Sequence, residues 1–249
     1  MRAITNQIFH NGSGVAAGDV DGDGRCDLYF GNIEGGNRLY RNLGDWRFVD
    51  ITTTSGVGCR GLPTTGVVLA DVDGDGDLDL VVNTIGSGTR LFVNDGHGQF
   101  RDTTQQAGLE RPSGAMSVSL ADIDRDGDLD LYVANYRSTT LRDEPDTRFR
   151  LKREGAATII TAVNERPVSE PDLVGRFGFD PSTGIVEHGE PDVLYRNNGR
   201  GVFSRVPWDQ GDFVDTQGRP SAIPFDWGLC GLLRDLDRKS TRLNSSHAS

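Results

Sequence analysis

Aspartates recur at a fixed spacing in three nine-residue segments. Residues 19–27, 71–79 and 122–130 each place Asp at the first, third, fifth and ninth positions and Gly at the sixth. Four carboxylates in so short a segment repel one another at neutral pH, so a compact loop needs a cation to hold it together. Oxygen ligands indicate a hard cation, and a loop with no His or Cys in register gives little support to zinc.

Calcium is the cation that this spacing favours. Four carboxylates with a carbonyl at the seventh position suit the six to eight flexible ligands of calcium better than the hydrated octahedron of magnesium. The loops are not EF-hands, because the twelfth position holds Phe30, Val82 or Val133 instead of Glu. A solvated acidic turn is the alternative for one isolated copy, but three copies in the same register favour a metal site.

The elements that position these loops follow from the repeat. The first Asp recurs after 52 and then 51 residues, whereas the interval to Asp235, in an unfinished fourth copy, is 113. Each loop runs into a β-type segment, and a period near fifty is typical of a propeller blade with four antiparallel strands. The 33 glycines and 10 prolines also suit short strands joined by turns. We therefore expect an all-β fold, a partial β-propeller of about three blades plus the start of a fourth.

The expected divisions follow from the register of the copies. They are a lead-in at residues 1–13, blades at 14–66, 67–117 and 118–229, the start of a truncated fourth blade at 230–238, and a tail at 239–249. The tail loses the register inside the motif and resembles translated adaptor sequence, so we expect it to be non-native.

The third blade contains an insert at about residues 136–191. It holds one expected hairpin, residues 148–152 with 158–163, followed by chain punctuated by Gly and Pro. Such an insert is either a partner surface or a structural flap. Aromatic residues also recur at two strand positions, which predicts a role in the core between blades. These residues are Tyr40, Phe92 and Tyr195 at one position and Phe48, Phe100 and Phe203 at the other.

Composition excludes several classes of partner. A net charge of −11 argues against nucleic acid and anionic membranes. No segment is long and apolar enough to span a membrane, and residues 1–14 lack the apolar core of a signal peptide. The three cysteines form no disulfide framework; one pair with one cysteine left over remains open, but free or buried thiols are favoured.

The loops, each followed by a β segment and a Leu-Tyr-Arg-Asn-type strand, resemble FG-GAP and VCBS repeats, which build the calcium-binding propeller of integrin α-subunits. The chain is more similar to secreted cartilage-acidic-protein-like proteins, which bacteria also carry and which often end in an ASPIC/UnbV domain. This resemblance implies an extracellular or cell-envelope location and three calcium sites. The implied ligands are Asp19, Asp21, Asp23, the Arg25 carbonyl and Asp27; Asp71, Asp73, Asp75, the Asp77 carbonyl and Asp79; and Asp122, Asp124, Asp126, the Asp128 carbonyl and Asp130.

The chain departs from that family in three respects. The fourth loop is unfinished, no ASPIC/UnbV segment is present, and three blades with a fragment do not make the seven typical of such propellers. We therefore expect the rest of the propeller to be missing from this chain, and the first and last blades to expose apolar faces.

Two functions compete at this point. The favoured one is a calcium-stabilised extracellular binding or adhesion scaffold, whose ligand is a protein or a carbohydrate. The alternative is a propeller-based polysaccharide lyase or hydrolase, which would need a carboxylate pair outside the loops. Only Glu187, Glu190 and Asp192, with His188 among them, form a loose cluster in the insert. Because their spacing specifies no geometry, we expect no catalytic residues.

Overall fold

The computed structural model describes residues 8–9, 12–221, 223 and 228. The unfinished fourth loop, the tail at 239–249 and Cys230 lie outside the described residues, so the expectations for them are not addressed by the structure.

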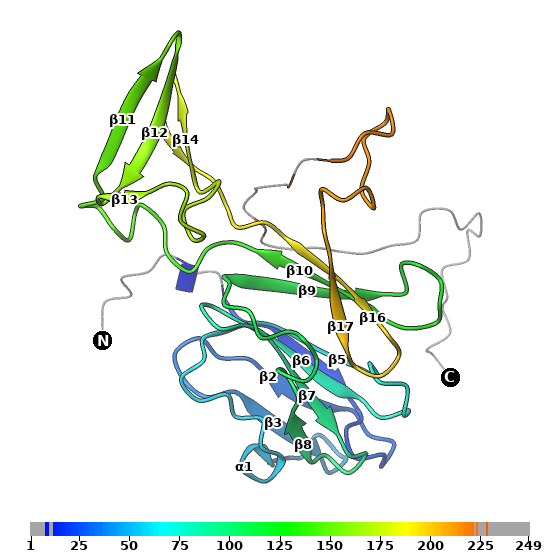
Figure 1. Ribbon diagram of the computed structural model, residues 1–249. Helices are drawn as coiled ribbons and strands as arrows, with labels where there is room; N and C mark the ends of the chain where they lie inside the picture. The colour runs from blue at the N-terminus through cyan, green and yellow to red at the C-terminus, as the bar shows by residue number, and fades with distance from the viewer. Residues whose placement is uncertain (1–7, 10–11, 222, 224–227, 229–249) are drawn as a thin grey trace.

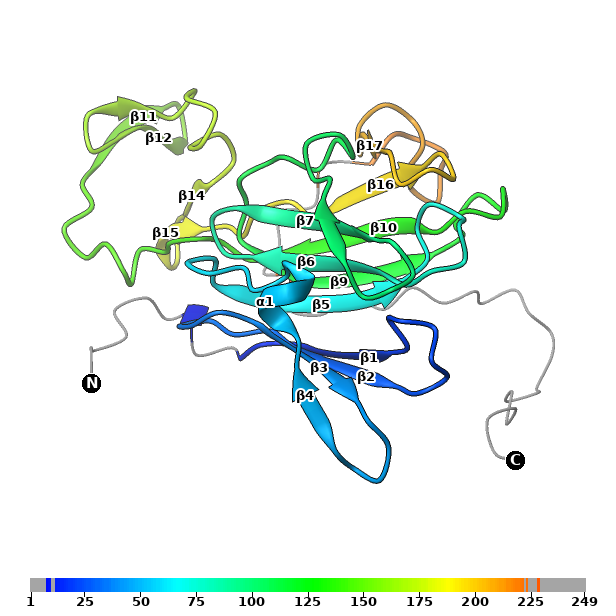
Figure 2. The same ribbon diagram turned by 90° about the horizontal axis from the view of Figure 1, so that it is seen from below.

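Three four-stranded antiparallel sheets form the body of the molecule (Figures 1 and 2). The first sheet contains β1 (Val15–Gly18), β2 (Asp27–Phe30), β3 (Arg38–Asn42) and β4 (Phe48–Asp50). The second contains β5 (Thr64–Ala70), β6 (Asp79–Thr84), β7 (Gly88–Asn94) and β8 (Phe100–Asp102). The third contains β9 (Ala115–Ala121), β10 (Asp130–Asn135), β16 (Val193–Asn197) and β17 (Phe203–Val206). The prediction of an all-β, partial-propeller fold is confirmed.

Each sheet follows the order in which its strands occur along the chain. The first strand pairs with the second across an Asp-rich loop, as in Gly18↔Asp27, Ala70↔Asp79 and Ala121↔Asp130. In the third sheet the pairing of β10 with β16 continues the pattern across the insert, with Leu131 opposite Tyr195. The same loop therefore occupies the same place in all three sheets.

The sheets stack face to face, and successive side chains of β6 pack alternately against the first and the third sheet. Leu80 and Val82 pack with Tyr29 and Leu39 of the first sheet, whereas Val81 packs with the cluster of the third sheet. All three β6 side chains are fully buried. A strand buried on both faces reads as a continuous apolar run, as Leu80-Val81-Val82 does in the sequence.

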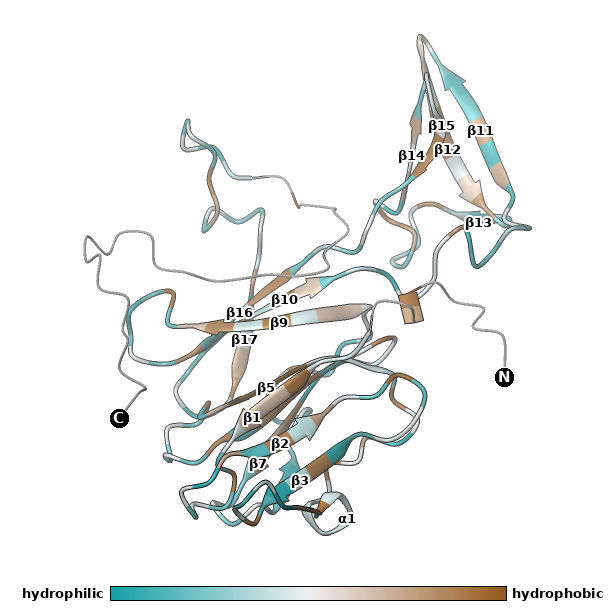
Figure 3. Ribbon diagram, turned by 180° about the vertical axis from the view of Figure 1, so that it is seen from behind, coloured by the Kyte–Doolittle hydropathy of each residue, from teal (hydrophilic) through white to brown (hydrophobic). Residues whose placement is uncertain are grey.

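The aromatic residues expected in the core are buried only where a neighbouring sheet covers them. Phe92, Tyr195 and Phe203 are buried, and Phe100 packs against the core between the first two sheets. Tyr40 and Phe48, at the corresponding positions of the first sheet, are only half-buried. Phe30 likewise is 41% exposed, whereas its counterpart Val82 is 0% exposed. Among the described residues no further sheet stacks on this outer face, and the strands of the first sheet combine hydrophobic and hydrophilic residues, as the hydropathy colours in Figure 3 show.

The insert folds as a separate β unit beside the third sheet (Figure 1). It contains the three-stranded sheet of β11 (Phe149–Glu154), β12 (Ala157–Val163) and β13 (Arg166–Pro167), and the hairpin of β14 (Phe177–Asp180) and β15 (Gly184–Glu187). The β11–β12 hairpin is the expected one. The β14–β15 hairpin replaces the irregular chain expected there, because Phe177 and Ile185 pack on a small core with Ile160, Val163 and Leu173.

One helical turn completes the described elements. The helix α1 (Thr52–Ser55) follows β4 and ends at Gly56, whose φ of 76° lies in the left-handed region. None of the helices among the described residues is long and apolar enough to cross a membrane.

Candidate metal centres

The first, third and ninth aspartates of each loop converge. In each of the three loops, one carboxylate oxygen from each of these residues lies within 4.8 Å of the other two. The groups are Asp19, Asp21 and Asp27; Asp71, Asp73 and Asp79; and Asp122, Asp124 and Asp130. Three carboxylates at this separation repel one another unless a cation or protons neutralise them.

The ninth aspartate is the buried anchor of each loop. Asp79 Oδ2 accepts a hydrogen bond from the Val72 amide at 3.1 Å, and its Oδ1 accepts one from the Asn94 amide at 2.9 Å. Asp27 and Asp130 make the same two bonds in their own sheets. The residue therefore joins the start of the loop to the end of the third strand of its sheet.

Burial perturbs this anchor. It raises the pKa of Asp79 to about 6, against the two amide hydrogen bonds, which lower it. Burial also raises the pKa of Asp27. A buried carboxylate without a basic partner is costly when charged, so a bound cation would stabilise its charged form.

The first aspartate wraps the loop around its own carboxylate. Asp19 accepts hydrogen bonds from four backbone amides, of which Gly22 at 2.9 Å and Gly24 at 2.7 Å are the shortest. Asp71 repeats two of these bonds and Asp122 one. Although burial acts in the opposite direction, these hydrogen bonds lower the pKa of Asp19. It therefore stays charged.

The fifth and seventh positions stand outside the three-carboxylate group. The fifth carboxylate accepts the amide hydrogen of the seventh residue: Arg25 donates to Asp23, Asp77 to Asp75 and Asp128 to Asp126, at 2.9 to 3.0 Å. This contact holds residue seven, whose carbonyl is the expected ligand, beside the fifth carboxylate. The fifth residues Asp23, Asp75 and Asp126 thus lie in the loop but not within the converging set.

Arginines accompany two of the three loops. Arg41 in β3 forms an ion pair with Asp21, and Arg196 in β16 forms one with Asp124, with Nε and Oδ2 2.8 Å apart. The corresponding position in β7 is Val93. Loop 71–79 is therefore the one whose third carboxylate has no arginine beside it among the described residues, and burial raises the pKa of that carboxylate, Asp73.

A strand-end asparagine connects neighbouring loops, a role that the sequence analysis missed. The side-chain nitrogen of Asn94 donates to Leu78 O at 3.1 Å in its own loop and to Val20 O at 2.9 Å in the loop of the first sheet. Asn197 repeats this pair of bonds to Leu129 and Val72. The signal was present in the recurrence of Asn42, Asn94 and Asn197 at one strand position.

Neighbouring sheets also cover two of the loops. The turn of the second sheet lies over loop 19–27, where Gly98 is close to Val20 and Asp21, and the turn of the third lies over loop 71–79. Val20 and Val72 are therefore 1% and 2% exposed, whereas Ile123 at the same position of loop 122–130 is 44% exposed. The first two loops therefore lie between neighbouring sheets of the chain, whereas the third lies at the surface.

The residues fit a hard cation. Asp21 Oδ1 is buried and has no hydrogen-bond partner, so its lone pairs are free for a ligand. The donors of each group are carboxylate oxygens, which suit calcium, and Gly22 and Gly24 supply the positive φ values of 72° and 82° that fold the loop tightly. A calcium ion would be held by the converging carboxylates and would neutralise their repulsion.

The acidic cluster in the insert is engaged in structural contacts. Glu187 binds the Arg176 guanidinium and the Leu141 amide, Glu190 accepts from the Gly114 amide at 2.7 Å, and Asp192 accepts from the Asn135 amide at 2.7 Å. His188 Nδ1 contacts the Gly175 carbonyl at 2.9 Å. The contacts of Glu190 and Asp192 tie the insert to the third sheet, whereas those of Glu187 and His188 lie within the insert. None of them supports a pair of catalytic carboxylates.

The Asp-rich loops lie in segments that match a known family of repeats. A model of the FG-GAP-like repeat matches residues 19–82 and 71–133, which include all three Asp-rich loops. The chain belongs to the FG-GAP-like repeat family. Each matched segment of this FG-GAP-like chain begins at one Asp-rich loop, continues through the next Asp-rich loop and ends in the strand that follows it, β6 or β10. This agrees with the repeat that the three sheets show.

The FG-GAP-like chain is also similar to curated relatives. It is 33% identical to Cartilage acidic protein 1 of Xenopus tropicalis over 176 residues. This alignment covers 68% of this chain and 26% of the relative. It is 31% identical to Cartilage acidic protein 1 of Homo sapiens over 207 residues, and this alignment covers 76% of this chain and 31% of the relative. The chain thus spans less than a third of the length of these relatives, so it compares with one part of them.

Proposed function

We propose that this chain is a calcium-binding part of an extracellular FG-GAP-like repeat scaffold that presents a binding or adhesion surface to a protein or carbohydrate ligand. The observation that carries the proposal is the convergence of three carboxylates in each of three equivalent loops. The similarity to proteins named for cartilage supports an extracellular setting. Calcium would act structurally, by neutralising carboxylates that also anchor backbone amides of the same sheet.

Calorimetric titration of the chain with calcium tests the metal sites. We expect binding at three loops and an increase in Tm, because the ion binds the folded form and relieves the repulsion within each loop. Asp21→Asn, Asp73→Asn and Asp124→Asn should each remove one site. Equal stabilisation by magnesium, or no calcium binding, would exclude the proposal.

A further inference from the structure

A buried arginine lies at the junction between the insert and the third sheet. Arg137 follows β10 and is 6% exposed. Its guanidinium donates to the carbonyls of His188 and Gly189, but no carboxylate of the described residues forms an ion pair with it. Burial and the nearby Arg176 guanidinium lower the pKa of Arg137, although the carboxylates of Glu190 and Glu187 act in the opposite direction. Buried charges in proteins are paired as a rule. Arg137 has carbonyl acceptors and nearby carboxylates, but no carboxylate of the described residues binds its guanidinium directly.

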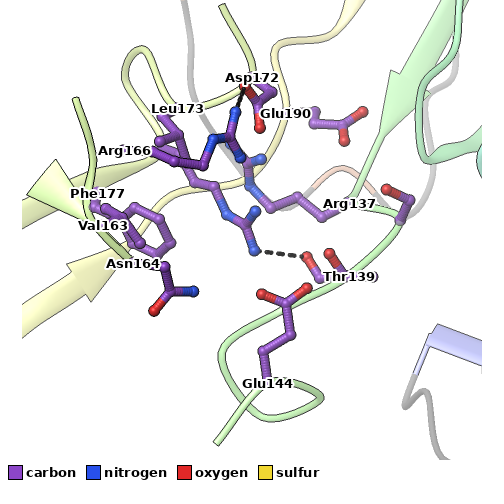
Figure 4. Close-up of a pocket in the computed structure, with 12 residues that line it drawn as sticks. Arg137, Thr139, Glu144, Val163, Asn164, Arg166, Asp172, Leu173, Phe177 and Glu190 are labelled. Carbon is purple, nitrogen blue, oxygen red and sulfur yellow. Dashed lines mark hydrogen bonds and ion pairs between the residues drawn. The ribbon is translucent and has the colours of Figure 1, made fainter. Parts of the chain in front are cut away.

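This arginine lines a cavity of about 300 Å³ (Figure 4). Arg137 and Arg166 extend into it from opposite sides, and Arg176 also contributes to the wall. Arg176 is fixed by Glu187 and by the Thr139 carbonyl, and Arg166 by Asp172 and Glu170. Arg137 is therefore the one arginine of this wall for which no ion pair with a carboxylate is found among the described residues, and Glu190 and Glu187 act on its charge only from a greater distance.

The remaining wall is polar and can accept as well as donate hydrogen bonds. Glu144, Glu190, Asn164 and Thr139 line the same cavity, and Glu144 is exposed to solvent. A guanidinium pairs with a carboxylate through two parallel hydrogen bonds, whereas carboxylate and amide side chains bind hydroxyl groups. The volume lies at the lower end of the range of small-molecule sites, which suits one sugar unit.

We propose that this cavity binds a carboxylated sugar unit, with the carboxylate at Arg137 and the hydroxyl groups toward Glu144 and Asn164. This inference specifies the chemical class of ligand for the proposed function. It rests on that function only in assuming that the insert forms part of the ligand-binding surface. The cavity is built from the insert and β10, and it includes none of the loop aspartates.

Binding of sodium glucuronate, with glucose as the matched sugar without a carboxylate, tests this proposal in ligand-observed NMR and calorimetry. The wild-type chain in calcium should bind glucuronate at least tenfold more tightly than glucose or acetate. Glucuronate affinity should fall about tenfold in Arg137→Gln and severalfold in Arg166→Gln, because each removes a positive charge from the cavity. Arg153→Gln, which removes an exposed arginine of the same insert outside the cavity, should bind like the wild type.

Each outcome decides the question. Glucuronate that binds no tighter than glucose, or that binds Arg166→Gln and Arg153→Gln equally well, overturns the inference even if Arg137→Gln fails to fold. Acetate binding as tightly as glucuronate overturns the assignment of a sugar. Calcium binding without glucuronate binding overturns this inference alone, and glucuronate binding without calcium binding overturns only the proposed metal sites.

Discussion

The side chain beside the third aspartate distinguishes otherwise equivalent loops. A guanidinium competes with a cation for the same carboxylate, as Arg41 does at Asp21 and Arg196 at Asp124. Val93 leaves Asp73 without such a competitor in loop 71–79. We therefore expect this loop to bind calcium most tightly. Val93→Arg should weaken that site about tenfold, or ~1.4 kcal/mol, in calorimetric titration.

The reciprocal changes provide the control for that experiment. Arg41→Val and Arg196→Val should strengthen the sites of loops 19–27 and 122–130 and leave loop 71–79 unchanged. Equal calcium affinity in the wild type and Val93→Arg would show that the arginines do not compete with the ion.

The pKa of Asp79 leads to a dependence of stability on pH. In the metal-free protein burial raises it to about 6, above the value of about 3.9 for an unfolded chain. The folded form therefore binds more protons between about pH 4 and 6, so the free energy of unfolding of the metal-free protein falls as pH rises through this window. Calcium stabilises the charged carboxylate. The increase in Tm caused by calcium should thus be larger at pH 7 than at pH 5, as measured by differential scanning calorimetry.

Asp79→Asn provides a check on the origin of this effect. The variant cannot ionise, so it should show a weaker pH dependence without calcium and a smaller response to calcium. An unchanged pH dependence in Asp79→Asn would mean that other groups control it.

At the scale of elements, the strand-end asparagines couple one sheet to the next. Asn94→Ala leaves the Leu78 and Val20 carbonyls without their side-chain donor, which should lower the free energy of unfolding by about 1–3 kcal/mol. The change should also weaken calcium binding in loop 19–27, although Asn94 belongs to another sheet. Chemical denaturation and calcium titration measure the two effects.

Asn42→Ala is the matched control. Its side chain donates to the Cys26 carbonyl of its own loop at 3.0 Å, and no bond to another sheet is found among the described residues. It should cost less stability than Asn94→Ala and affect only loop 19–27. If both variants behave alike, the bond between sheets contributes nothing measurable.

The sequence predicted the elements that depend on short-range spacing. The loops, the strands that follow them and the β11–β12 hairpin are all set by turns and alternation within a few tens of residues. The β14–β15 hairpin was missed because its stability comes from packing on Ile160 and Leu173, which no local pattern indicates. The link from Asn94 to Val20 and the burial of Arg137 at the junction with the insert could not be predicted either, because each depends on which segments become neighbours.

Within the described residues the sheets form an open stack, and the outer face of the first sheet carries exposed apolar side chains beside the Arg38–Asp50 ion pair. Val15 is 60% exposed and Phe30 is 41% exposed on this face of the first sheet, where the two residues lie opposite each other in the register. In the second sheet Val67, Leu80 and Val82 at the corresponding face pack against the first. Made as printed, the chain should therefore self-associate in calcium, because an apolar sheet face of this kind favours a partner. Size-exclusion chromatography with light scattering measures the oligomeric state.

Two surface variants test whether self-association depends on this face or on exposed apolar residues in general. Phe30→Lys should shift the population toward the monomer, whereas Val174→Lys, at an exposed apolar residue of the insert, should not. A wild-type chain that is monomeric in calcium would show that the open face is tolerated in water.

The insertion point has a consequence for the order of folding. Three residues join β6 to β7 and seven join β2 to β3, but 57 separate β10 from β16. Closing the longest of these connections costs about 2–3 kcal/mol more in chain entropy than closing the shortest, if the connection is a flexible coil. Early formation of the hairpins within the insert would shorten the flexible part of the connection and so lower the entropy cost of pairing β16 with β10. We therefore expect the third sheet to be the last to assemble, at a rate that depends on a segment that contributes none of its strands.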